Sequence, residues 1–464
     1  MITPSLDACG AFVSYLETLF ALSMNDLHTM INDFHGDMRT GLSGHEGSLK
    51  MLPSFVDKPT GREKGAFITL DLGGTHFRIL AVQLDGKGGT TVLGTRQTAV
   101  PRKVMQGRGE ALFDFMAEGM DAFLTKRGFE RTRTYDLAFT FSFPVEPTGV
   151  SAGMLIKWTK GFTATGVEGK DVVILLKEAL RRKGIDCIRV TALANDTVGT
   201  LMARSYRDPS CDLGVILGTG TNACYREKCA HIARLEGAPP EGFMIVNMEW
   251  GNFDKVRRTC YDRDLDAASV NPGAMPLEKM VSGMYLGEIA RRVLVDAVQR
   301  DVLFLNAAGA LKRFKRKGSL TTPEMSLIEG DDTSDLAGVH DFLKQKGVSG
   351  SSIEDRRLLK RLCGWVSGRG AGLAAAATAA VVTWMDPELK HRHTVAVDGS
   401  LFEKYTRFSA KMRAVLTDLY GKKADNIAWV HSRDGSGRGA AIIAAVAATA
   451  SPQGPGHSSK ANFP

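Results

Sequence analysis

The spacing of apolar residues changes from helical to strand-like after about 60 residues. Between Phe12 and Ile31 apolar side chains recur every three or four positions, which predicts helix in the first part of the chain. A connector rich in glycine, serine and proline follows at residues 41–61. Two β-rich runs, residues 66–70 and 78–84, are then joined by a turn with two glycines, which predicts a hairpin.

A second unit of strand, glycine turn and strand returns far downstream, at residues 213–225. Further strands are predicted at residues 137–141, 187–191, 394–397 and 427–430, and helices at residues 172–182, over most of 275–386, and near the C-terminus before a polar tail at 451–464. The mixed order of strands and helices, with two similar hairpins, predicts a two-lobed α/β protein with a cleft.

Composition narrows the class of protein. The chain has 464 residues, 44% of them hydrophobic and 24% charged, which excludes a disordered or collagen-like chain. The net charge of +8 is too small to indicate wrapping by nucleic acid, although it suits an anionic ligand. Seven cysteines without a CxxC pair favour reduced thiols over a disulfide or zinc framework.

The sequence shows no targeting signal, and this predicts a cytoplasmic protein. The N-terminus has neither the basic region nor the apolar run of a signal peptide. The apolar stretches at residues 372–385 and 440–450 are shorter than the roughly 18 to 20 residues of a membrane span. We therefore expect a cytoplasmic protein with neither nucleic acid nor membrane as a partner.

Glycine turns are the first chemical signal. The chain has 50 glycines, and three of its turns place glycine beside Thr or Ser next to a strand or helix start: Gly73, Gly74 and Thr75; Gly218, Thr219, Gly220 and Thr221; and Gly435, Ser436 and Gly437. Glycine lets backbone amides approach an anion, and the hydroxyl adds a donor, so three such turns favour a phosphate site. A P-loop is excluded because no GxxxxGK[ST] occurs.

One of these turns also fits another class of enzyme. Gly218, Gly220 and Ala223 match the letters of a dinucleotide fingerprint after a strand, so an NAD-linked oxidoreductase is an alternative.

Acids at strand ends are the second signal. Asp71 ends an apolar strand, which indicates either a cap or a metal-bound phosphate, and we favour the metal. Asp196 lies between Asn195 and Thr197 at the start of a helix, where the local sequence does not distinguish a functional acid from an N-cap. Glu249 follows a strand-like run. Together with the amides of Asn195 and Asn222 and the hydroxyl of Ser142, these acids suit a polyhydroxy substrate such as a sugar.

At this point the motifs resemble those of the eukaryotic-type hexokinase and glucokinase family, over residues from about 50 to 450. The segments that carry the resemblance are FITLDLGGTHFRI, FTFSFPVE, LIKWTKGFTATGVEGKDVV, ALANDTVGTLMA, GVILGTGTNA, NMEWGNFD, NPGAMPLEKMVSGMYLGE, VAVDGSLFEKY and DGSGRGAA. The resemblance implies the actin-like ATPase fold, with two lobes closing over a hexose and Mg-ATP. It implies an N-terminal helical part of the large lobe at 1–61, a small lobe at 62–194, the large lobe at 195–437, and a C-terminal helix returning to the small lobe within 438–464.

The resemblance also implies roles for individual residues. Asp196 would be the general base for the sugar 6-hydroxyl in ATP-dependent phosphorylation, with Lys160 beside the reacting oxygens. The sugar-binding residues would be Ser142, Phe143, Thr159, Lys160, Asn195, Asp196, Asn222, Glu249 and Glu278. The nucleotide-binding residues would be Asp71, which holds Mg²⁺ through water, Gly73, Gly74, Thr75, Arg78 and Thr219, and, at the adenosine, Gly399, Ser400, Ser436 and Gly437.

Several positions depart from the family pattern. His76 stands in place of the usual Asn, Met248 in place of Cys, and Ala274 and Met275 in place of two glutamines. Met275 removes a polar group that the resemblance places near the sugar, which leaves the preferred hexose open. A catalytically weak sugar sensor on the same fold is an alternative, disfavoured because Asp71, Lys160 and Asp196 are all present, and the assembly is expected to be a monomer or homodimer.

Overall fold

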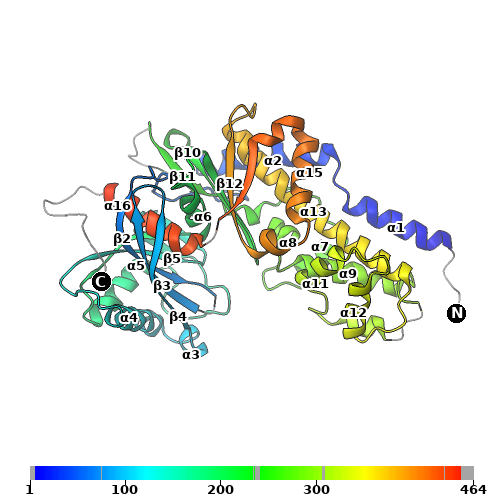
Figure 1. Cartoon of the computed structure of the whole chain (residues 1–464), viewed down its shortest axis with the longest axis horizontal. Helices are drawn as coiled ribbons and strands as arrows, with labels where there is room; N and C mark the ends of the chain where they lie inside the picture. The colour runs from blue at the N-terminus through cyan, green and yellow to red at the C-terminus, as the bar shows by residue number, and fades with distance from the viewer. Residues whose placement is uncertain are drawn as a thin grey trace.

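The computed structural model describes residues 6–74, 76–233, 235, 241–305, 309–432 and 434–450. Two bodies lie side by side in Figure 1, each built around a twisted sheet. Thr75 and the polar tail predicted at 451–464 lie outside the described residues.

The first sheet has five strands in the order β4–β3–β2–β5–β8. Their bounds are β2 (Lys64–Leu72), β3 (His76–Asp85), β4 (Thr90–Ala99), β5 (Tyr135–Phe141) and β8 (Ile188–Ala194). β2 and β3 form the predicted antiparallel hairpin, β4 extends it antiparallel, and β5 and β8 continue it parallel. The strands predicted at 66–70, 78–84 and 137–141 are confirmed, and that predicted at 187–191 is β8, which begins one residue later. We call the body around this sheet the small lobe.

The second sheet repeats this arrangement. Its order is β1–β11–β10–β9–β12–β13, with β1 (Leu52–Pro53), β9 (Cys211–Leu217), β10 (Thr221–Lys228), β11 (Phe243–Asn247), β12 (His393–Asp398) and β13 (Ile427–His431). β9, β10 and β11 pair antiparallel, and β9, β12 and β13 pair parallel, as β2, β3, β4, β5 and β8 do. The body around this sheet is the large lobe, so the two-lobed α/β prediction with two similar hairpins is confirmed. A small sheet of β6 (Val145–Gly149) and β7 (Ala152–Leu155) completes the strands.

Helices cover both sheets. They are α1 (Leu6–Phe20), α2 (Met24–Leu42), α3 (Arg102–Met105), α4 (Gly109–Lys126), α5 (Val172–Arg182), α6 (Asp196–Ser205), α7 (Cys260–Ala267), α8 (Pro276–Val281), α9 (Leu286–Gln299), α10 (Ala310–Lys315), α11 (Thr322–Gly330), α12 (Ala337–Gln345), α13 (Ile353–Met385), α14 (Ser400–Lys404), α15 (Phe408–Tyr420) and α16 (Ala440–Ala450). Short 3₁₀ turns occur at Cys229–His231, Trp250–Asn252 and Gly421–Asn426, and the π-helical turn η4 spans Gly435–Gly439.

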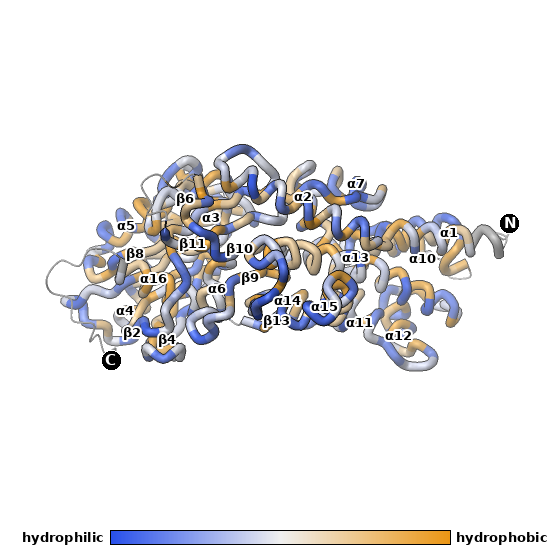
Figure 2. Tube along the Cα trace, turned by 90° about the horizontal axis from the view of Figure 1, so that it is seen from above, coloured by the Kyte–Doolittle hydropathy of each residue, from blue (hydrophilic) through white to orange (hydrophobic). Residues whose placement is uncertain are grey.

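The small-lobe sheet is buried on both faces. Leu112 and Met116 of α4 and Leu176 of α5 pack with Ile79 and Phe139 of the sheet. On the other face α16 packs against β2, β5 and β8, although it follows the large-lobe strands in the sequence. Figure 2 colours much of α16 as hydrophobic, which fits its position under the sheet.

The long alanine-rich helix α13 organises the large lobe. It packs against α2, α9 and α15, and its small side chains allow those helices to approach closely. Among the described residues, none of the helices is both long enough and apolar enough to cross a membrane.

The fold overturns the dinucleotide alternative. Gly218 and Gly220 form the turn between β9 and β10, which pair antiparallel with Leu217 opposite Thr221. A dinucleotide fingerprint needs a strand that runs into a helix, whose N-terminus faces the pyrophosphate. The turn between β9 and β10 leads into another strand, so an NAD-linked oxidoreductase loses its sequence basis.

Candidate active site

A cationic side chain joins the end of the first hairpin to the turn η4. Arg78 on β3 donates to Asp434 Oδ1 at 2.5 Å and to Ser436 Oγ at 3.0 Å. Its Nη2 lies 3.7 Å from Asp71 Oδ2 at the end of β2. Gly73, whose amide donates to the His76 carbonyl at 3.1 Å, makes the turn between these two strands. Arg78 therefore holds the first glycine turn beside η4.

Asp71 has the features of a carboxylate that could bind a cation. Burial raises its pKa to about 6, with hydrogen bonding to Ser436 and the charge of Arg78 acting in the opposite direction. Its Oδ1 is buried and has no hydrogen-bond partner. An ionised oxygen in this position costs free energy unless a ligand satisfies it.

The donor set fits Mg²⁺ carried by a nucleotide rather than a protein-bound metal cage. Within the described parts of the chain, no three or more His, Cys, Asp or Glu side chains are grouped to hold a metal ion. Mg²⁺ often keeps several waters and needs one or two carboxylates plus substrate phosphates. A single carboxylate with an unpartnered oxygen, as at Asp71, meets that requirement.

The start of α6 shows which of two adjacent residues, Asn195 and Asp196, caps the helix. Asn195 accepts the backbone N–H of Thr197 at 2.8 Å and so caps the helix. The adjacent Asp196 accepts from the Thr197 hydroxyl at 3.2 Å and is partly exposed. Because Asn195 serves as the cap, the carboxylate of Asp196 is available for other contacts.

Asp196 lies within electrostatic reach of acids in both lobes. After burial, which is the larger cause, its negative charge contributes to raising the pKa of Asp71 and that of Glu249. Asp71 belongs to the small-lobe sheet and Glu249 follows the large-lobe strand β11. Asp196 thus connects the first glycine turn with the predicted sugar-binding acids.

Glu249 is held by two amides. Asn247 donates to its Oε1 at 2.8 Å and Asn222 at 3.2 Å, while Asn222 also donates to Asn247 at 2.9 Å. Glu249 has a left-handed backbone, with φ of 53°, which is uncommon for a residue other than glycine. Burial raises the pKa of Glu249, and the two amides partly offset this shift. Asn247, which the sequence reasoning assigned no role, is therefore part of the site.

Glu278 on α8 faces the second glycine turn. Its Oε2 accepts the backbone N–H of Thr221 at 3.1 Å, and a Cβ added to Gly220 would lie 2.6 Å from that oxygen. Burial raises the pKa of Glu278, whereas the Thr221 amide and the positive charges of Lys160 and Lys279 lower it. The charge of Lys160 acts across the lobes, since Glu278 belongs to the large lobe.

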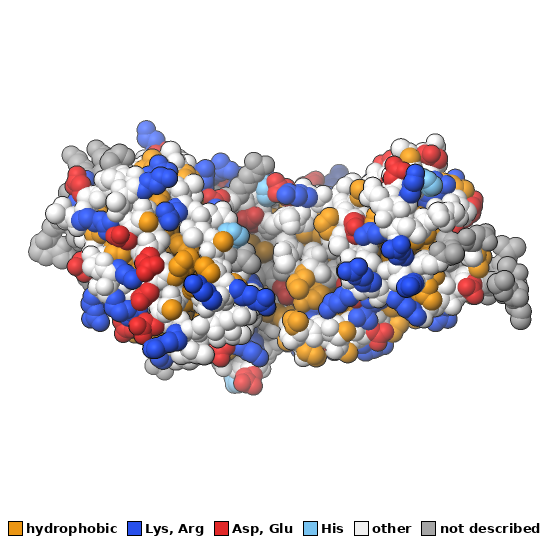
Figure 3. All heavy atoms as spheres, turned by 90° about the horizontal axis from the view of Figure 1, so that it is seen from below, with side chains coloured by type: hydrophobic (Ala, Val, Ile, Leu, Met, Phe, Trp, Pro, Cys, Tyr) orange, Lys and Arg blue, Asp and Glu red, His pale blue; other side chains and the backbone are white. Residues whose placement is uncertain are grey.

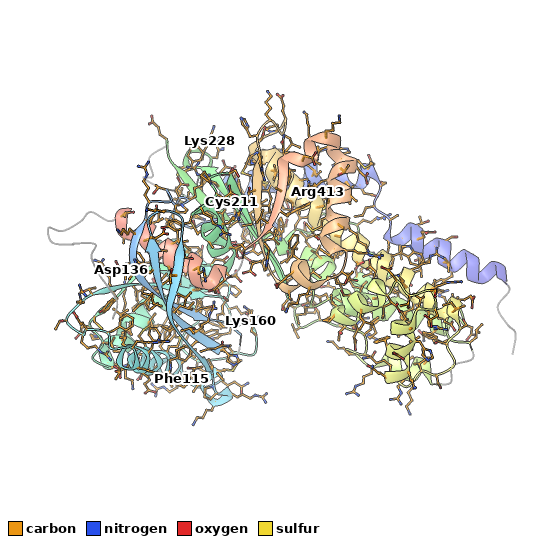
Figure 4. The ribbon with its side chains drawn as sticks, viewed as in Figure 1. Phe115, Asp136, Lys160, Cys211, Lys228 and Arg413 are labelled. Atoms are coloured by element: carbon orange, nitrogen blue, oxygen red, sulfur yellow. The ribbon has the colours of Figure 1, made fainter. Side chains whose placement is uncertain are left out.

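Lys160 lies at the edge of the small lobe that faces the large lobe (Figure 4). Its Nζ donates to the Ser142 carbonyl at 2.6 Å and lies 5.4 Å from the ring centre of Phe143. A Cβ added to Gly74 would lie 3.6 Å from Lys160 Cδ, so the lysine passes close to the first glycine turn. The neighbouring Thr159 is exposed and its carbonyl accepts the backbone N–H of Phe162 at 3.1 Å.

A cavity between the lobes collects residues from both sheets. Its lining includes Phe141, Phe143 and Asn195 from the small-lobe side and Asn247 and Glu249 from the large-lobe side. Figure 3 shows a hollow between the two bodies on the face seen from below. Of the nine predicted sugar-binding residues, three line this cavity: Phe143, Asn195 and Glu249.

The predicted adenosine set is divided between two places. Gly399, just before α14, lies against the second glycine turn, where a Cβ added to Gly218 would be 3.3 Å from Gly399 Cα. Ser400 begins α14 and Thr219 is exposed beside it in the turn. Ser436 instead lies beside Arg78, with Gly437 next to it in η4.

A further cavity of about 290 Å³ adjoins the second glycine turn. Met284, in its wall, donates its amide to the Thr219 carbonyl at 3.2 Å, and Gly283 donates to Gly218 at 2.8 Å. Thr321 and Thr322 lie in its lining. The sequence assigned no role to these two threonines, because they lie at the start of α11, far from the second glycine turn in the sequence.

The departures from the family pattern lie in different surroundings. Met248 is buried in the core and Ala274 is exposed. Met275 has a left-handed backbone, with φ of 54°, and a Cβ added to Gly251 would lie 3.4 Å from its sulfur. His76 is exposed at the start of β3. Among the residues that depart from the family pattern, Met275 is therefore the one that lies beside Gly251, which also approaches Glu278.

Comparisons with known proteins agree on one family. Two family models, both described as Hexokinase, match residues 13–206 and 212–446. Hexokinase-2 of Solanum tuberosum is 44% identical over 426 residues, covering 88% of this chain and 85% of the relative. Hexokinase-1 of Homo sapiens is 41% identical over 449 residues, covering 93% of this chain and 48% of that protein. A solved hexokinase from Schistosoma mansoni complexed with glucose has a TM-score of 0.82 and 35% identity, covering 95% of this chain and 99% of that one.

Proposed function

The chain belongs to the hexokinase family of ATP-dependent sugar kinases, and we propose that its sugar is D-glucose. The reaction phosphorylates the 6-hydroxyl group and gives glucose 6-phosphate and ADP. The observation that carries the proposal is that the charge of Asp196, after burial, contributes to raising the pKa of both Asp71 in the small lobe and Glu249 in the large lobe. A base between a phosphate turn and a pair of sugar-binding acids suits transfer of a phosphoryl group to a sugar hydroxyl.

The sugar is held by acids and amides. Glu249 and Glu278 accept hydrogen bonds from the sugar hydroxyls, and Asn195 and Asn222 supply amide contacts. Two carboxylates that each accept hydroxyl donors orient a hexose ring so that one hydroxyl points at the base. The network of Asn222, Asn247 and Glu249 supports this role because it fixes the carboxylate before the sugar arrives. The small lobe contributes three further sugar-binding residues to this proposal: Ser142, Phe143 and Thr159.

Asp196 takes the proton from the sugar 6-hydroxyl as that oxygen attacks the γ-phosphate. Phosphoryl transfer depends mainly on positioning and on stabilising charge on the phosphate oxygens. Lys160 is the cation for that charge, and its closeness to Gly74 and its influence on Glu278 support this placement.

The nucleotide lies along the two glycine turns. Amides of Gly73 and Gly74 and the side chain of Arg78 face its phosphates, with Thr219 on the opposite turn. Mg²⁺ supplies charge neutralisation of the phosphate oxygens, and Asp71 would hold it through water. The unpartnered Oδ1 of Asp71 supports this assignment.

The adenosine lies beyond the second turn. Gly399 and Ser400 line it, and Ser436 and Gly437 close the phosphate end next to Arg78. The cavity of about 290 Å³ beside Met284 supports this direction because its wall is hydrogen-bonded to the turn. Pockets for small molecules begin at about this size.

The reaction would be the first step of glycolysis, in the cytoplasm. The six cysteines whose side chains are described are all free, which supports a reducing compartment. A relative named Hexokinase-4, chloroplastic, from Oryza sativa is 43% identical, so fractionation of cells is needed to separate cytoplasm from plastid.

Initial rates with several sugars and donors test the proposal. Purified protein is assayed with glucose, fructose and mannose, each with Mg-ATP and with pyrophosphate. We expect the highest kcat/KM with glucose and ATP. A higher kcat/KM with another hexose would overturn the glucose assignment, and no product from any hexose at millimolar concentration would overturn the kinase assignment in favour of a sugar sensor.

A further inference from the structure

A basic recess lies in the small lobe, away from the candidate active site. It has a volume of about 350 Å³ and lies between β4 and the C-terminal end of α4, which Figure 1 shows in the lower part of that lobe. Its lining consists of Thr95, Arg96, Gln97, Thr98, Phe123, Lys126 and Arg127. Three of these side chains are cationic and none is acidic.

The strand register turns Arg96 inward. Arg96 pairs with Ile79 and Thr98 pairs with Phe77 on the neighbouring strand β3. Directly opposed residues of antiparallel strands point to the same face, and both Ile79 and Phe77 are buried in the core that includes Met116 of α4. Arg96 therefore occupies a position on the helix-covered face, where an apolar residue is expected.

The guanidinium group of Arg96 lacks a compensating partner. Its Nε is buried and makes no hydrogen bond. Across the described residues, no ion pair of the structure includes Arg96, Lys126 or Arg127. By contrast, Arg182 and Arg189 in the same lobe each pair with an aspartate, at 2.6 Å and 2.5 Å. A partly buried arginine with an unpaired Nε costs free energy unless an anion satisfies it.

A glycine makes room for the second arginine. A Cβ added to Gly94 would lie 2.9 Å from Arg127 Nε and 3.1 Å from Cζ, so the guanidinium lies directly over the strand backbone. Gly94 pairs with the buried Ala81, which places it on the same face as Arg96. Two guanidinium groups are thus directed to one recess.

We propose that this recess binds the phosphoryl group of a small phosphate ester. Guanidinium groups match phosphate oxygens with paired N–H donors, Lys126 adds a point charge, and Thr98, on the same face as Arg96, supplies a hydroxyl donor at the rim. A volume of about 350 Å³ suits a molecule of the size of a sugar phosphate and is too small for a folded partner.

The recess is connected to the candidate active site through the sheet. Gln97 of β4 pairs with Arg78 of β3, the arginine that contacts Asp434 and Ser436. Further along β4, Thr90 accepts from Arg438 of η4 at 3.0 Å. An anion at the recess would thus bind on the strand that neighbours the first glycine turn, without occupying that turn.

Calorimetric titration of the whole protein tests the proposal, with glucose 6-phosphate and inorganic phosphate as the two probes. The test variant is R96Q/R127Q, and the matched control is R102Q/R181Q, which removes two exposed charges of the same lobe outside the recess. We expect wild type and the control to bind, and the test variant to bind about tenfold or more weakly. A larger loss of affinity for glucose 6-phosphate than for inorganic phosphate in R96Q/R127Q indicates a sugar phosphate ligand, an equal loss indicates the free anion, and both support a phosphoryl site. Equal binding isotherms for wild type and R96Q/R127Q would overturn the proposal. The absence of binding by wild type at about 10 mM of either probe would also overturn it.

A second variant separates geometry from charge. Gly94→Ala leaves every charge in place but pushes Arg127 away from the strand. We expect weaker binding of the same probe and unchanged sugar kinase rates at saturating substrate. Binding equal to that of wild type, in a variant whose thermal unfolding is unchanged, would show that Arg127 does not contact the anion.

Discussion

Glu278 accepts a hydrogen bond from the backbone amide of Thr221, with Oε2 and N 3.1 Å apart. This contact joins an acid on α8 to the turn between β9 and β10, and so links the proposed sugar-binding end of the site to the proposed phosphate end. The contact needs glycine at position 220, because a Cβ there would lie 2.6 Å from the same carboxylate oxygen.

Gly220→Ala should therefore displace Glu278. We expect kcat/KM for the sugar to fall about 10- to 100-fold, because small displacements of positioning groups have effects of this size. Gly36→Ala is the control, since a Cβ there meets no atom within 4 Å. Steady-state kinetics of both variants provide the measurement, and equal losses in the two would remove the special role of Gly220.

Asp196→Ala should abolish most turnover while sugar binding persists. Loss of a general base typically lowers the rate by about 10²- to 10⁴-fold. Glucose binding, measured by calorimetry, should stay detectable because Glu249, Glu278 and the amides remain. The control Asp264→Ala removes an exposed acid of α7. A turnover rate near that of wild type in Asp196→Ala would refute the assignment of the base.

Asp71→Asn should stabilise the protein and impair its use of Mg-ATP. Burial raises the pKa of Asp71 from 3.8 to about 6, so ionisation costs stability as the pH rises through this window. An asparagine does not ionise, so the variant should gain about 1–3 kcal/mol above pH 6 and lose that gain near pH 4.

Urea unfolding of Asp71→Asn at pH 7 and pH 4.5 measures this gain, with Asp418→Asn as an exposed control. In wild type, the affinity for Mg-ATP should fall as the pH drops below about 6, where Asp71 takes up a proton. A gain in stability that is independent of pH would contradict the raised pKa.

Asp262→Ala should destabilise the large lobe. Asp262 receives two hydrogen bonds of 2.6 Å from Arg369, and both side chains are buried. Removing one partner of a buried pair leaves an uncompensated charge and costs about 3–5 kcal/mol. Glu388→Ala, which breaks an exposed pair with Lys390, should cost less than about 1 kcal/mol. Thermal unfolding of the two variants compares them, and similar shifts would contradict the account.

The strands that could be predicted from the sequence are those with a continuous apolar run. β2 is buried along nearly its whole length, and its run at residues 66–70 ends at Asp71, so both the strand and the acid were apparent. β4 did not stand out because it is an edge strand with threonine, arginine and glutamine at most positions. α4 was missed as well, and its start at Arg108 lacks a side-chain cap.

Within the candidate site, the sequence placed residues in turns but not in relation to one another. It left open whether Asp196 was a cap, and the hydrogen bond from Thr197 to Asn195 resolves this. The approach of Lys160 to Gly74 joins segments more than 80 residues apart, and no local pattern encodes such a contact. Asn247 joined the site through its hydrogen bond to Glu249.

The central claim is that this chain transfers the γ-phosphate of ATP to the 6-hydroxyl of glucose. The most direct measurement is the appearance of glucose 6-phosphate, followed through a glucose-6-phosphate dehydrogenase coupled to NADP⁺ reduction, with purified protein, Mg-ATP and millimolar glucose. We predict steady formation of glucose 6-phosphate that requires Mg-ATP and is lost in Asp196→Ala. The absence of glucose 6-phosphate with folded wild-type protein would contradict the account.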